Sequence, residues 1–321
     1  MMERIWFNSY PPGVPEAIDV ESYSSLVDCF EQSAKQYGDR IAFSNFGVSL
    51  SYAELDRYSR NFAAYLQQEM GVKGDRVGII LPNLLQFPIV VFAILRIGAI
   101  VVTVNPLYTA PELVHQLSDA EASTVIVLEN FAHVLQEALA KTGVKNIIIT
   151  KMGDVLGLLK GSAINFVVKH IKKMVPQYAL PRAVMYQQAI KKGKQLSLSP
   201  VAVTGEDVAF LQYTGGTTGV SKGAVLTHRN MVANILQVLT WVKESLNPEK
   251  DIVIGALPLY HIFSLTVCCL CFIAIGSECV LITNPRDLPA FFKELSKVKT
   301  TIFLGLNTLF NAMLHHPDFS K

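Results

Sequence analysis

The chain has 321 residues, of which 50% are hydrophobic and 17% charged, enough to bury a large core in two domains or subdomains. Its net charge of +2 gives no general reason to expect nucleic acid binding. Five cysteines, an odd number, with four in one apolar region, indicate a reduced intracellular protein. Cys268 and Cys271 form a C-x-x-C pair, but no second pair or nearby histidine completes a zinc site, so buried thiols are favoured.

Two apolar stretches, 89–104 and 252–277, resemble membrane spans in length or composition. Arg96 interrupts the first, and Pro258 and His261 divide the second into shorter elements. Soluble α/β proteins also contain strands and crossover helices that are apolar on all sides. We therefore expect both stretches to be buried elements. The first fifteen residues contain no apolar signal-peptide core, so we expect no secretory signal.

Strands and helices alternate along the first part of the chain. A capping-box pattern, Ser51-Tyr52-Ala53-Glu54, begins a helix over 55–66. The elements predicted next are strand 76–81, helix 87–97, strand 99–104, helix 111–117, strand 124–128, helix 131–141 and strand 146–150. Repeated β-α-β units with short connections predict a parallel sheet covered by helices.

The lysine-rich stretch 151–200 interrupts this alternation. Apolar residues recur at near-helical spacing from Ile164 to Val175, with basic residues between them at 169–173. This pattern predicts a cationic amphipathic helix, which could lie on an anionic membrane face. The alternative is a surface helix packed on its own domain with its lysines in water, and this second interpretation is slightly favoured.

A loop rich in glycine and hydroxyl groups lies between apolar runs at 208–211 and 224–226. Its residues are Tyr213, Thr214, Gly215, Gly216, Thr217, Thr218, Gly219, Val220, Ser221, Lys222 and Gly223. Glycine lets the backbone approach a ligand, successive N–H groups form an anion site, and Lys222 adds a point charge. The sequence predicts a polyphosphate site, although its spacing is not that of the common P-loop because Gly223 follows Lys222. A hairpin that binds nothing is the weaker alternative, because it needs only one or two turn residues.

The alternation resumes after the loop. The predicted elements are a helix from Thr227 to about 246, strand 251–256, helix 263–275, strand 278–283, helix 288–298, strand 300–304 and helix 308–315. They predict a second parallel sheet, still incomplete where the chain stops at Lys321. We expect a first α/β subdomain over 1–199, with the cationic insert near 155–195, and a second over 200–321 that carries the phosphate loop.

Leu257-Pro258-Leu259-Tyr260-His261 follows a predicted strand, at the end of a sheet where α/β proteins bind ligands. A single histidine among apolar residues is usually part of a core, and for His261 alone the two interpretations are balanced. Beside a phosphate loop and an apolar wall, we expect His261 to orient a carboxylate while the wall contacts an alkyl tail. Five other histidines have no such context: His115, His133, His228, His315 and His316.

The loop at 213–223 resembles the phosphate-binding motif of the acyl-adenylate-forming enzymes, and Leu257 to His261 resembles that family's next motif. The stretches 50–66 and 95–108 resemble two earlier, structural motifs. Within the family, the chain from Met2 to Lys321 is most similar to long-chain fatty-acid–CoA ligases. The stretches that match this subgroup are Pro82-Asn83-Leu84-Leu85-Gln86, Asn105-Pro106-Leu107-Tyr108, Phe210-Leu211-Gln212-Tyr213, Thr227-His228-Arg229-Asn230-Met231 and Ile282-Thr283-Asn284-Pro285-Arg286-Asp287.

The resemblance implies a ligase that uses ATP, Mg²⁺ and coenzyme A to convert a long-chain fatty acid, through an acyl-adenylate, into acyl-CoA, AMP and pyrophosphate. Lys222 and His261 are the implied catalytic residues. The implied nucleotide site runs from Tyr213 to Ala224, with Thr217 and Thr218 on the β and γ phosphates and Thr214 near the metal. The implied acyl site consists of His261, Phe263, Leu265, Gly305, Asn307 and Thr308.

The family's later motifs, its β-barrel subdomain and its C-terminal domain with a catalytic lysine are absent from these residues. The resemblance therefore implies the amino-terminal part of a ligase, inactive alone. One alternative is another acyl-activating synthetase, and a second is a non-catalytic protein that binds nucleotide or a membrane surface. We expect a cytoplasmic protein that makes peripheral contact with the inner face of an anionic membrane. We expect no nucleic acid partner, and the sequence leaves open whether the protein forms a homodimer.

Overall fold

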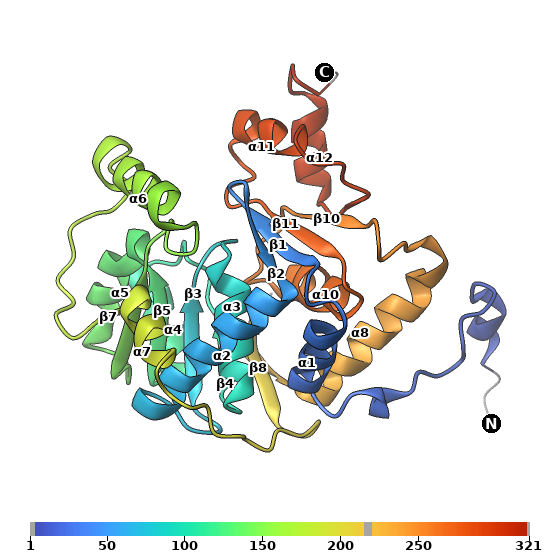
Figure 1. Ribbon diagram of the computed structural model, residues 1–321, viewed down its shortest axis with the longest axis horizontal. Coiled ribbons are helices and arrows are strands. Elements are labelled where there is room, and N and C mark those ends of the chain that lie inside the picture. Colours follow the sequence, from blue (N-terminus) through green and yellow to red (C-terminus); the bar gives the residue numbers. More distant parts are fainter. Residues whose placement is uncertain (1–3, 215–219, 320–321) are drawn as a thin grey trace.

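The structure, a computed structural model, describes residues 4–214 and 220–319 and contains two β-sheets surrounded by helices (Figure 1). The first sheet has the order β7-β6-β5-β3-β4-β8-β9 and the second the order β12-β10-β11-β1-β2. The first comprises β3 (Arg76–Ile80), β4 (Ile100–Thr103), β5 (Thr124–Leu128), β6 (Asn146–Thr150), β7 (Val184–Met185), β8 (Val208–Thr214) and β9 (Lys222–Thr227). The second comprises β1 (Ile41–Asn45), β2 (Val48–Ser51), β10 (Ile252–Gly255), β11 (Glu278–Leu281) and β12 (Ile302–Phe303).

The helices lie between and around these strands. The α-helices are α1 (Leu26–Gln36), α2 (Tyr52–Glu69), α3 (Gln86–Arg96), α4 (Ala110–Asp119), α5 (Ala132–Leu139), α6 (Leu158–Phe166), α7 (Tyr186–Gly193), α8 (His228–Val242), α9 (Ile262–Ser264), α10 (Phe272–Ala274), α11 (Leu288–Leu295) and α12 (Asn307–Leu314). Short 3-10 segments are η1 (Ile5–Ser9), η2 (Val20–Ser22), η3 (Glu129–Phe131) and η5 (Lys243–Ser245), and π-helical segments are η4 (Val167–Ile171) and η6 (Leu265–Cys271). The predicted alternation of strands and helices is thus confirmed, and so is the capping box of Ser51 and Glu54 that begins α2.

The predicted parallel sheets are mixed. Each sheet carries one antiparallel pair at an edge, β8 with β9 and β1 with β2, whereas neighbours such as β3–β4, β3–β5 and β10–β11 are parallel. The β1–β2 hairpin was not predicted. Its turn residues, Phe46 and Gly47, both have positive φ, and phenylalanine is not one of the residues that usually marks such a turn.

Strand pairing crosses the boundary predicted at 199/200. β8, which precedes the phosphate loop, pairs with β4 of the first sheet, and β1 pairs in parallel with β11 of the second. The loop assigned to the second subdomain therefore extends from the edge of the first sheet. Pairings between strands so distant in sequence depend on the fold as a whole, and local sequence patterns do not reveal them. The two-subdomain division itself stays a prediction.

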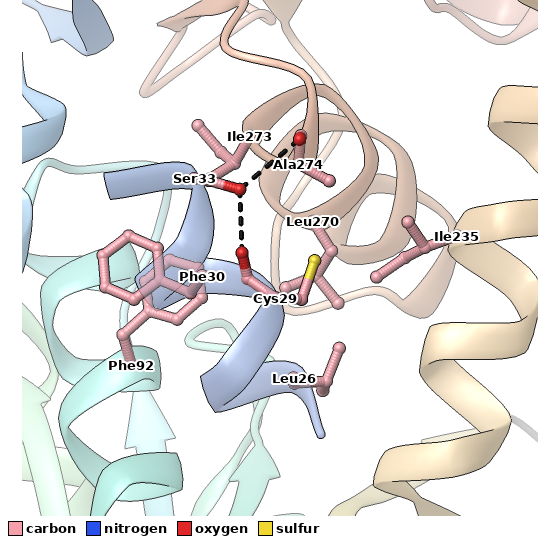
Figure 2. A pocket seen from close by; sticks show the side chains of 9 residues that line it. All are labelled: Leu26, Cys29, Phe30, Ser33, Phe92, Ile235, Leu270, Ile273 and Ala274. Carbon is pink, nitrogen blue, oxygen red and sulfur yellow. Dashed lines mark hydrogen bonds between the residues drawn. The ribbon is translucent and has the colours of Figure 1, made fainter. Parts of the chain in front are cut away.

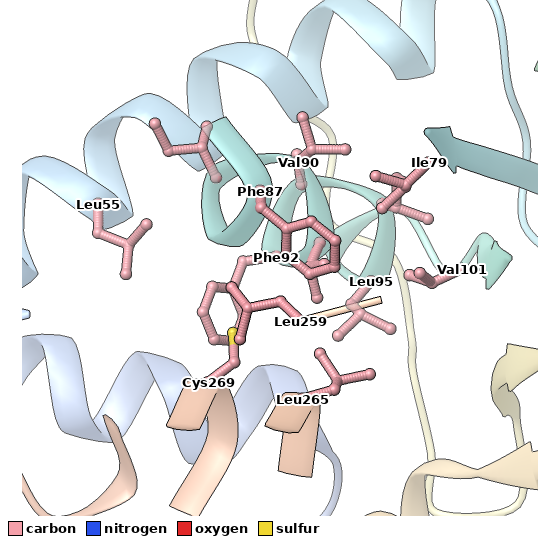
Figure 3. Packing of buried hydrophobic residues seen from close by; sticks show 14 of the residues in the cluster. Leu55, Ile79, Phe87, Val90, Phe92, Leu95, Val101, Leu259, Leu265 and Cys269 are labelled. Atoms are coloured by element: carbon pink, nitrogen blue, oxygen red, sulfur yellow. The ribbon is translucent and has the colours of Figure 1, made fainter. Parts of the chain in front are cut away.

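One apolar core joins the two sheets. Every residue of α3 is buried, and its side chains pack with Leu55 of α2 and with Leu259, Leu265 and Cys269 of the second half of the chain (Figure 3). This all-round burial explains why 89–104 is so apolar. The stretch 252–277 likewise divides into β10, α9, η6 and α10, as predicted. Within residues 4–214 and 220–319, no helix combines the length and apolar character that a membrane span requires.

Helix α1 packs tightly over η6 and α10. The space between them is a void of about 10 Å³, lined by Leu26, Cys29, Phe30, Ser33, Phe92, Ile235, Leu270, Ile273 and Ala274 (Figure 2). The Ser33 hydroxyl donates to the carbonyls of Cys29, at 2.8 Å, and Ala274, at 3.4 Å. All five cysteines are free and buried, as predicted, and burial raises the pKa of the Cys29 thiol to about 12.

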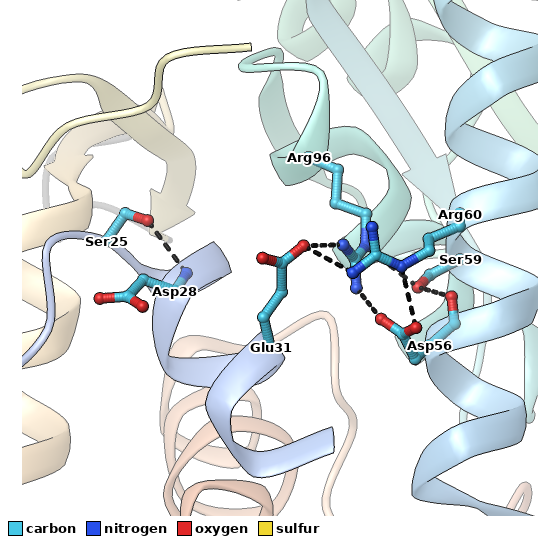
Figure 4. Close-up of polar contacts among 7 residues, drawn as sticks. All are labelled: Ser25, Asp28, Glu31, Asp56, Ser59, Arg60 and Arg96. Carbon is cyan, nitrogen blue, oxygen red and sulfur yellow. Dashed lines mark hydrogen bonds and ion pairs between the residues drawn. The ribbon is translucent and has the colours of Figure 1, made fainter. Parts of the chain in front are cut away.

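Arg96, the residue that interrupts the first apolar stretch, joins three helices at its site (Figure 4). Arg96 is the last residue of α3. Its side chain is 2% exposed and pairs with Glu31 of α1 and Asp56 of α2. It also donates to the Ser59 hydroxyl at 3.3 Å and lies over the Phe30 ring. Burial lowers the pKa of Arg96, and the charge of Asp56 opposes that effect. A buried guanidinium is tolerated here because acidic partners surround it.

We expect Arg96→Met to lower the free energy of unfolding by about 2–3 kcal/mol, because it removes the buried guanidinium that joins α3 to Glu31 and Asp56 and leaves the two carboxylates with only the half-exposed Arg60. Arg60 contacts the same Glu31 and Asp56, each at 2.9 Å, but its side chain is 46% exposed. Arg60→Met is thus a matched control and should cost less than about 1 kcal/mol. Urea unfolding followed by circular dichroism measures both, and equal losses would contradict the role of Arg96.

The cationic amphipathic helix is present, but it begins and ends earlier in the chain than the predicted 164–175. α6 and η4 cover 158–171 and are followed by a turn in which Lys173 has φ of 51°. Val168 is buried, whereas Leu158 and Leu159 are each 90% exposed. Other exposed apolar side chains of this segment are Phe166, Ile171 and Met174. The segment therefore presents both apolar and basic side chains to solvent. Contact with an anionic membrane and packing as a surface helix on its own domain both stay predictions.

Candidate active site

The predicted phosphate loop connects the two strands at one edge of the first sheet. Thr214, at the end of β8, and Lys222, at the start of β9, are directly paired in the antiparallel ladder. Opposed side chains in such a pair lie on the same face, and both residues are exposed. The structure thus brings a hydroxyl and an ammonium group together at the base of the loop. The other predicted loop residues, Gly215, Gly216, Thr217, Thr218 and Gly219, lie outside the described residues.

Tyr213 fixes the other face of the hairpin. Its side chain is 9% exposed, and its hydroxyl donates to Asp119 of α4 at 2.5 Å. Burial raises the pKa of Tyr213, and the bond to Asp119 raises it further. Gly223 is paired with Tyr213, and a Cβ at that position would meet the ring at 2.9 Å. The absence of a side chain at Gly223 therefore leaves room for the Tyr213 ring, so this glycine is needed for packing as well as for backbone conformation.

A second contact from α4 holds the far arm of the loop. The Nε2 atom of His115 lies 2.9 Å from the Ser221 carbonyl oxygen, to which it donates. Val220 and Ala224, also predicted for the nucleotide site, are exposed. Because α4 contacts both arms, through His115 and Asp119, the loop is anchored to one rigid element. The sequence did not indicate these two residues, since neither belongs to a recognisable motif.

Two buried amides of the first sheet, one on the loop strand β8 and one after β3, bind the segment that leads to His261. Gln212 of β8 accepts a hydrogen bond from the Thr103 hydroxyl at 2.9 Å and donates to the Tyr260 carbonyl at 3.2 Å. Asn83 follows β3 and donates to the carbonyls of Gly255, at 2.9 Å, and Leu257, at 2.8 Å, while it accepts from the Leu259 N–H at 2.8 Å. The carboxyl ends of strands in both sheets therefore meet at one place, where α/β proteins bind ligands.

His261 lies at this junction and is exposed. It is the N-cap of α9, and its Nδ1 atom accepts a long hydrogen bond of 3.4 Å from the Phe263 N–H. In the neutral ring this arrangement leaves the proton on Nε2. Such a donor suits a carboxylate. The position of this segment between the sheets is set by Asn83 and Gln212, which lie in two of the family-matching stretches but had no predicted role.

The other residues predicted for the acyl site differ in exposure. Phe263 is 45% exposed, whereas Leu265 is completely buried in the main core, where it supports the segment from below. Gly305 lies between β12 and α12, whereas Asn307 and Thr308 are the first two residues of α12 and are exposed. A Cβ on Gly305 would meet the Phe310 ring at 2.6 Å. The roles of these residues in acyl binding stay predictions.

The family resemblance places Thr214 near the metal. Its hydroxyl is one oxygen donor of the kind that Mg²⁺ accepts, and Mg²⁺ often takes its remaining ligands from substrate phosphates and water. Over residues 4–214 and 220–319 the structure has no group of three or more His, Cys, Asp or Glu side chains arranged to hold a metal ion. The Thr214 hydroxyl could serve as one oxygen ligand of a metal that is carried by a nucleotide.

Comparison with known proteins identifies this arrangement. Residues 30–321 match the family described as AMP-binding enzyme. Long-chain-fatty-acid–CoA ligases are 52% identical over 321 residues in Escherichia coli O6:H1 and 47% identical over 324 residues in Haemophilus influenzae, in each case over 100% of this chain. The chain spans only 57% and 58% of those two relatives.

Solved structures show the same fold. A long-chain-fatty-acid-CoA ligase (FadD1) from Archaeoglobus fulgidus superposes with a TM-score of 0.73 at 26% identity, over 96% of this chain and 57% of that one. The anthranilate CoA ligase AuaEII, in complex with anthranoyl-AMP, gives a TM-score of 0.78 at 19% identity, over 94% and 54% of the two chains. With the family match over 30–321, the chain belongs to the AMP-binding enzymes.

Proposed function

We propose that this chain carries the nucleotide and acyl sites of a long-chain fatty-acid–CoA ligase, an AMP-forming acid–thiol ligase. In the first step a fatty carboxylate attacks the α-phosphate of ATP, and pyrophosphate leaves. In the second step the thiol of coenzyme A attacks the acyl carbon and AMP leaves, giving acyl-CoA. The main support is the hydrogen-bonded junction of Gln212 and Asn83, which holds the phosphate hairpin beside His261. Relatives of that name at 52% identity support the substrate class.

The first step brings two anions together, and the residues of the hairpin reduce their repulsion. Lys222 places an ammonium group opposite Thr214 at the base of the loop, where it can offset charge on the phosphates. The anchors from α4 to both arms hold the donors in place before substrate arrives, so little reorganisation is needed. Mg²⁺, when bound with the nucleotide, would neutralise further phosphate charge.

The acyl side combines an orienting donor with apolar surface. In our proposal the Nε2–H of His261 donates to the substrate carboxylate and fixes it toward the α-phosphate. The exposed ring of Phe263 contacts the start of the alkyl chain. Burial of each methylene group contributes about 0.8 kcal/mol, so chain length affects affinity strongly. A substrate with an amino group would instead require a buried charge partner.

The substrate class can be tested by binding of acyl-sulfamoyl adenosines, which mimic the acyl-adenylate. We expect the palmitoyl analogue to bind this chain at least 100-fold more tightly than the benzoyl analogue, because burial of about four methylenes is enough for that ratio. Calorimetric titration gives both affinities. Tighter binding of the benzoyl analogue would indicate another acyl-activating synthetase, and no binding of either would favour a non-catalytic role.

We also propose that the segment 158–171 makes a peripheral contact with an anionic membrane at the inner face of the cell membrane. Leu158 and Leu159, each 90% exposed, lie on the same segment as the exposed Lys169. Apolar insertion and basic attraction together favour an interfacial helix. Leu158→Ser with Leu159→Ser should abolish co-sedimentation with anionic vesicles, and high salt should weaken it for the wild type. Salt-insensitive sedimentation, or none with anionic lipid, would contradict the proposal.

A further inference from the structure

A second cavity lies away from the phosphate hairpin, at the other side of the first sheet. It has a volume of about 360 Å³ and is lined by Glu129, Lys151, Ser162, Asn165, Phe166, Lys169 and His170. Glu129 directly follows β5, and Lys151 directly follows β6. The cavity is therefore located at the carboxyl ends of two parallel strands. The volume is in the range of small-molecule sites.

The strand order makes this a favoured place for a ligand. β3 lies between β4 and β5, and the sheet continues through β6 to β7. After β3 the chain forms β4 on one side of β3, and then forms β5, β6 and β7 in succession on the other side. The order in which strands are added therefore reverses between β3 and β5. Ligands in open α/β sheets bind beside such a reversal, at the carboxyl ends of the strands. Glu129 is the first residue after β5 at this point.

Helix α6 is fixed against the turn that follows β6, beside this open cavity. A Cβ on Gly153, after β6, would meet the carbonyl oxygen of Gly161 in α6 at 2.2 Å, and a Cβ on Gly161 would meet the Gly153 carbonyl oxygen at the same distance. The backbone of α6 therefore touches the turn after β6, and larger residues at either glycine would separate them. The Gly153 N–H also donates to the Asn165 carbonyl oxygen, Oδ1, at 2.7 Å. These contacts hold α6 and η4 over the strand ends.

Glu129 holds a buried, unpaired acceptor next to this space. The residue is 1% exposed, and its Oε2 atom has no hydrogen-bond partner among the described residues. Burial raises the pKa of Glu129, and the positive charges of Lys151 and Lys169 oppose that rise. A buried acceptor without a donor costs about 1–3 kcal/mol. A ligand that brings a hydroxyl donor would remove this cost.

The other lining groups favour an anion with an apolar face. Among the lining residues Lys151 and Lys169 accompany the single carboxyl group of Glu129, while the carboxyl group of Asp154, which does not line the cavity, also acts on Glu129. Lys169 and His170 are exposed. Ser162 and Asn165 add polar groups, and the Phe166 ring offers a surface on which a carbon skeleton can pack. Lysine is a common phosphate-binding residue, and hydroxyl groups are the donors that suit a carboxylate in a cationic setting.

We propose that this cavity binds the phosphate ester of a polyol, with its hydroxyl groups donating to Glu129 and its phosphate paired with Lys151 and Lys169. The ligand can be a free polyol phosphate or the glycerol-phosphate headgroup of a lipid, since both present the same groups. The site is distinct from the hairpin of Lys222, and the proposal does not depend on the ligase activity.

Titration of this chain with glycerol 3-phosphate, without ATP, tests the proposal by calorimetry. We expect binding at least 10-fold tighter than that of ethyl phosphate, which has the phosphate but lacks the hydroxyls. Glu129→Gln should remove this preference, and Lys169→Met should weaken both ligands at least 10-fold. Lys172→Met, a neighbouring exposed lysine outside the cavity, is the matched control and should change neither affinity.

Vesicles distinguish the two sources of the ligand. If a lipid headgroup is the ligand, vesicles with phosphatidylglycerol should bind more tightly than vesicles with phosphatidic acid of equal charge, and Glu129→Gln should abolish the difference. If a free ester is the ligand, glycerol 3-phosphate should bind and the two vesicles should not differ. Absence of a hydroxyl preference with both kinds of probe, or binding that Lys169→Met does not weaken, would overturn the proposal.

Discussion

Lys222→Ala should lower the rate of ATP–pyrophosphate exchange by the complete protein by about 100- to 1000-fold, the range seen when one preorganised charge donor is removed from a reaction centre. Lys222 opens β9 directly opposite Thr214, at the base of the loop where we propose that the phosphates bind. Two unit charges 4 Å apart interact by about 4 kcal/mol near a protein surface, which is sufficient for a loss of this size. Because the residue is exposed, folding should not change.

Two variants make this result specific. Lys222→Arg retains the charge and should retain part of the exchange activity, although a planar guanidinium does not reproduce the position of an ammonium group. Lys243→Ala removes an exposed lysine just beyond α8 and should leave the rate unchanged. Exchange at the wild-type rate in Lys222→Ala would show that the hairpin does not stabilise the reacting phosphates.

Much of the fold could be predicted because the sequence repeats one local pattern. Apolar strands and helices from β3 to β6 are separated by clear turns, and each predicted element there exists with boundaries shifted by only a few residues. The β1–β2 hairpin was not predicted because its turn at Phe46 and Gly47 lacks the usual residues. Its pairing with β11, which lies more than 200 residues away, is a tertiary property that no local pattern contains.

The candidate site was predictable only in part, for a similar reason. The loop and the segment of His261 have unusual compositions, which indicate chemistry by themselves. Asn83, Gln212, His115 and Asp119 are ordinary polar residues, and their importance comes from where the fold places them. A signal existed for Asn83, because it follows an apolar strand at the sheet end where ligands bind. The sequence signal for Gln212 was weaker: it is a polar residue within an otherwise apolar strand, and the structure buries it.

The junction of the two sheets depends most on Asn83, and Asn83→Asp should lower the free energy of unfolding by about 2–4 kcal/mol. The change keeps the size of the side chain and the acceptor for the Leu259 N–H, but it removes the donors to the carbonyls of Gly255 and Leu257. A carboxylate would then face two carbonyl oxygens in a site that is 3% exposed. Urea unfolding measures the loss.

The same variant should also impair the acyl site, because Asn83 holds the backbone on which His261 is placed. We expect the palmitoyl-sulfamoyl adenosine to bind at least 10-fold more weakly to folded Asn83→Asp, while affinity for inorganic pyrophosphate, which needs only the hairpin, changes little. Asn234→Asp is the matched control, since Asn234 is exposed on α8 and its amide makes only a long contact of 3.5 Å with Gln237. It should alter neither stability nor binding. A stable Asn83→Asp variant with unchanged analogue affinity would mean that the hydrogen bonds of Asn83 do not position the segment of His261. The link between the two sheets would then depend on Gln212 and the apolar core.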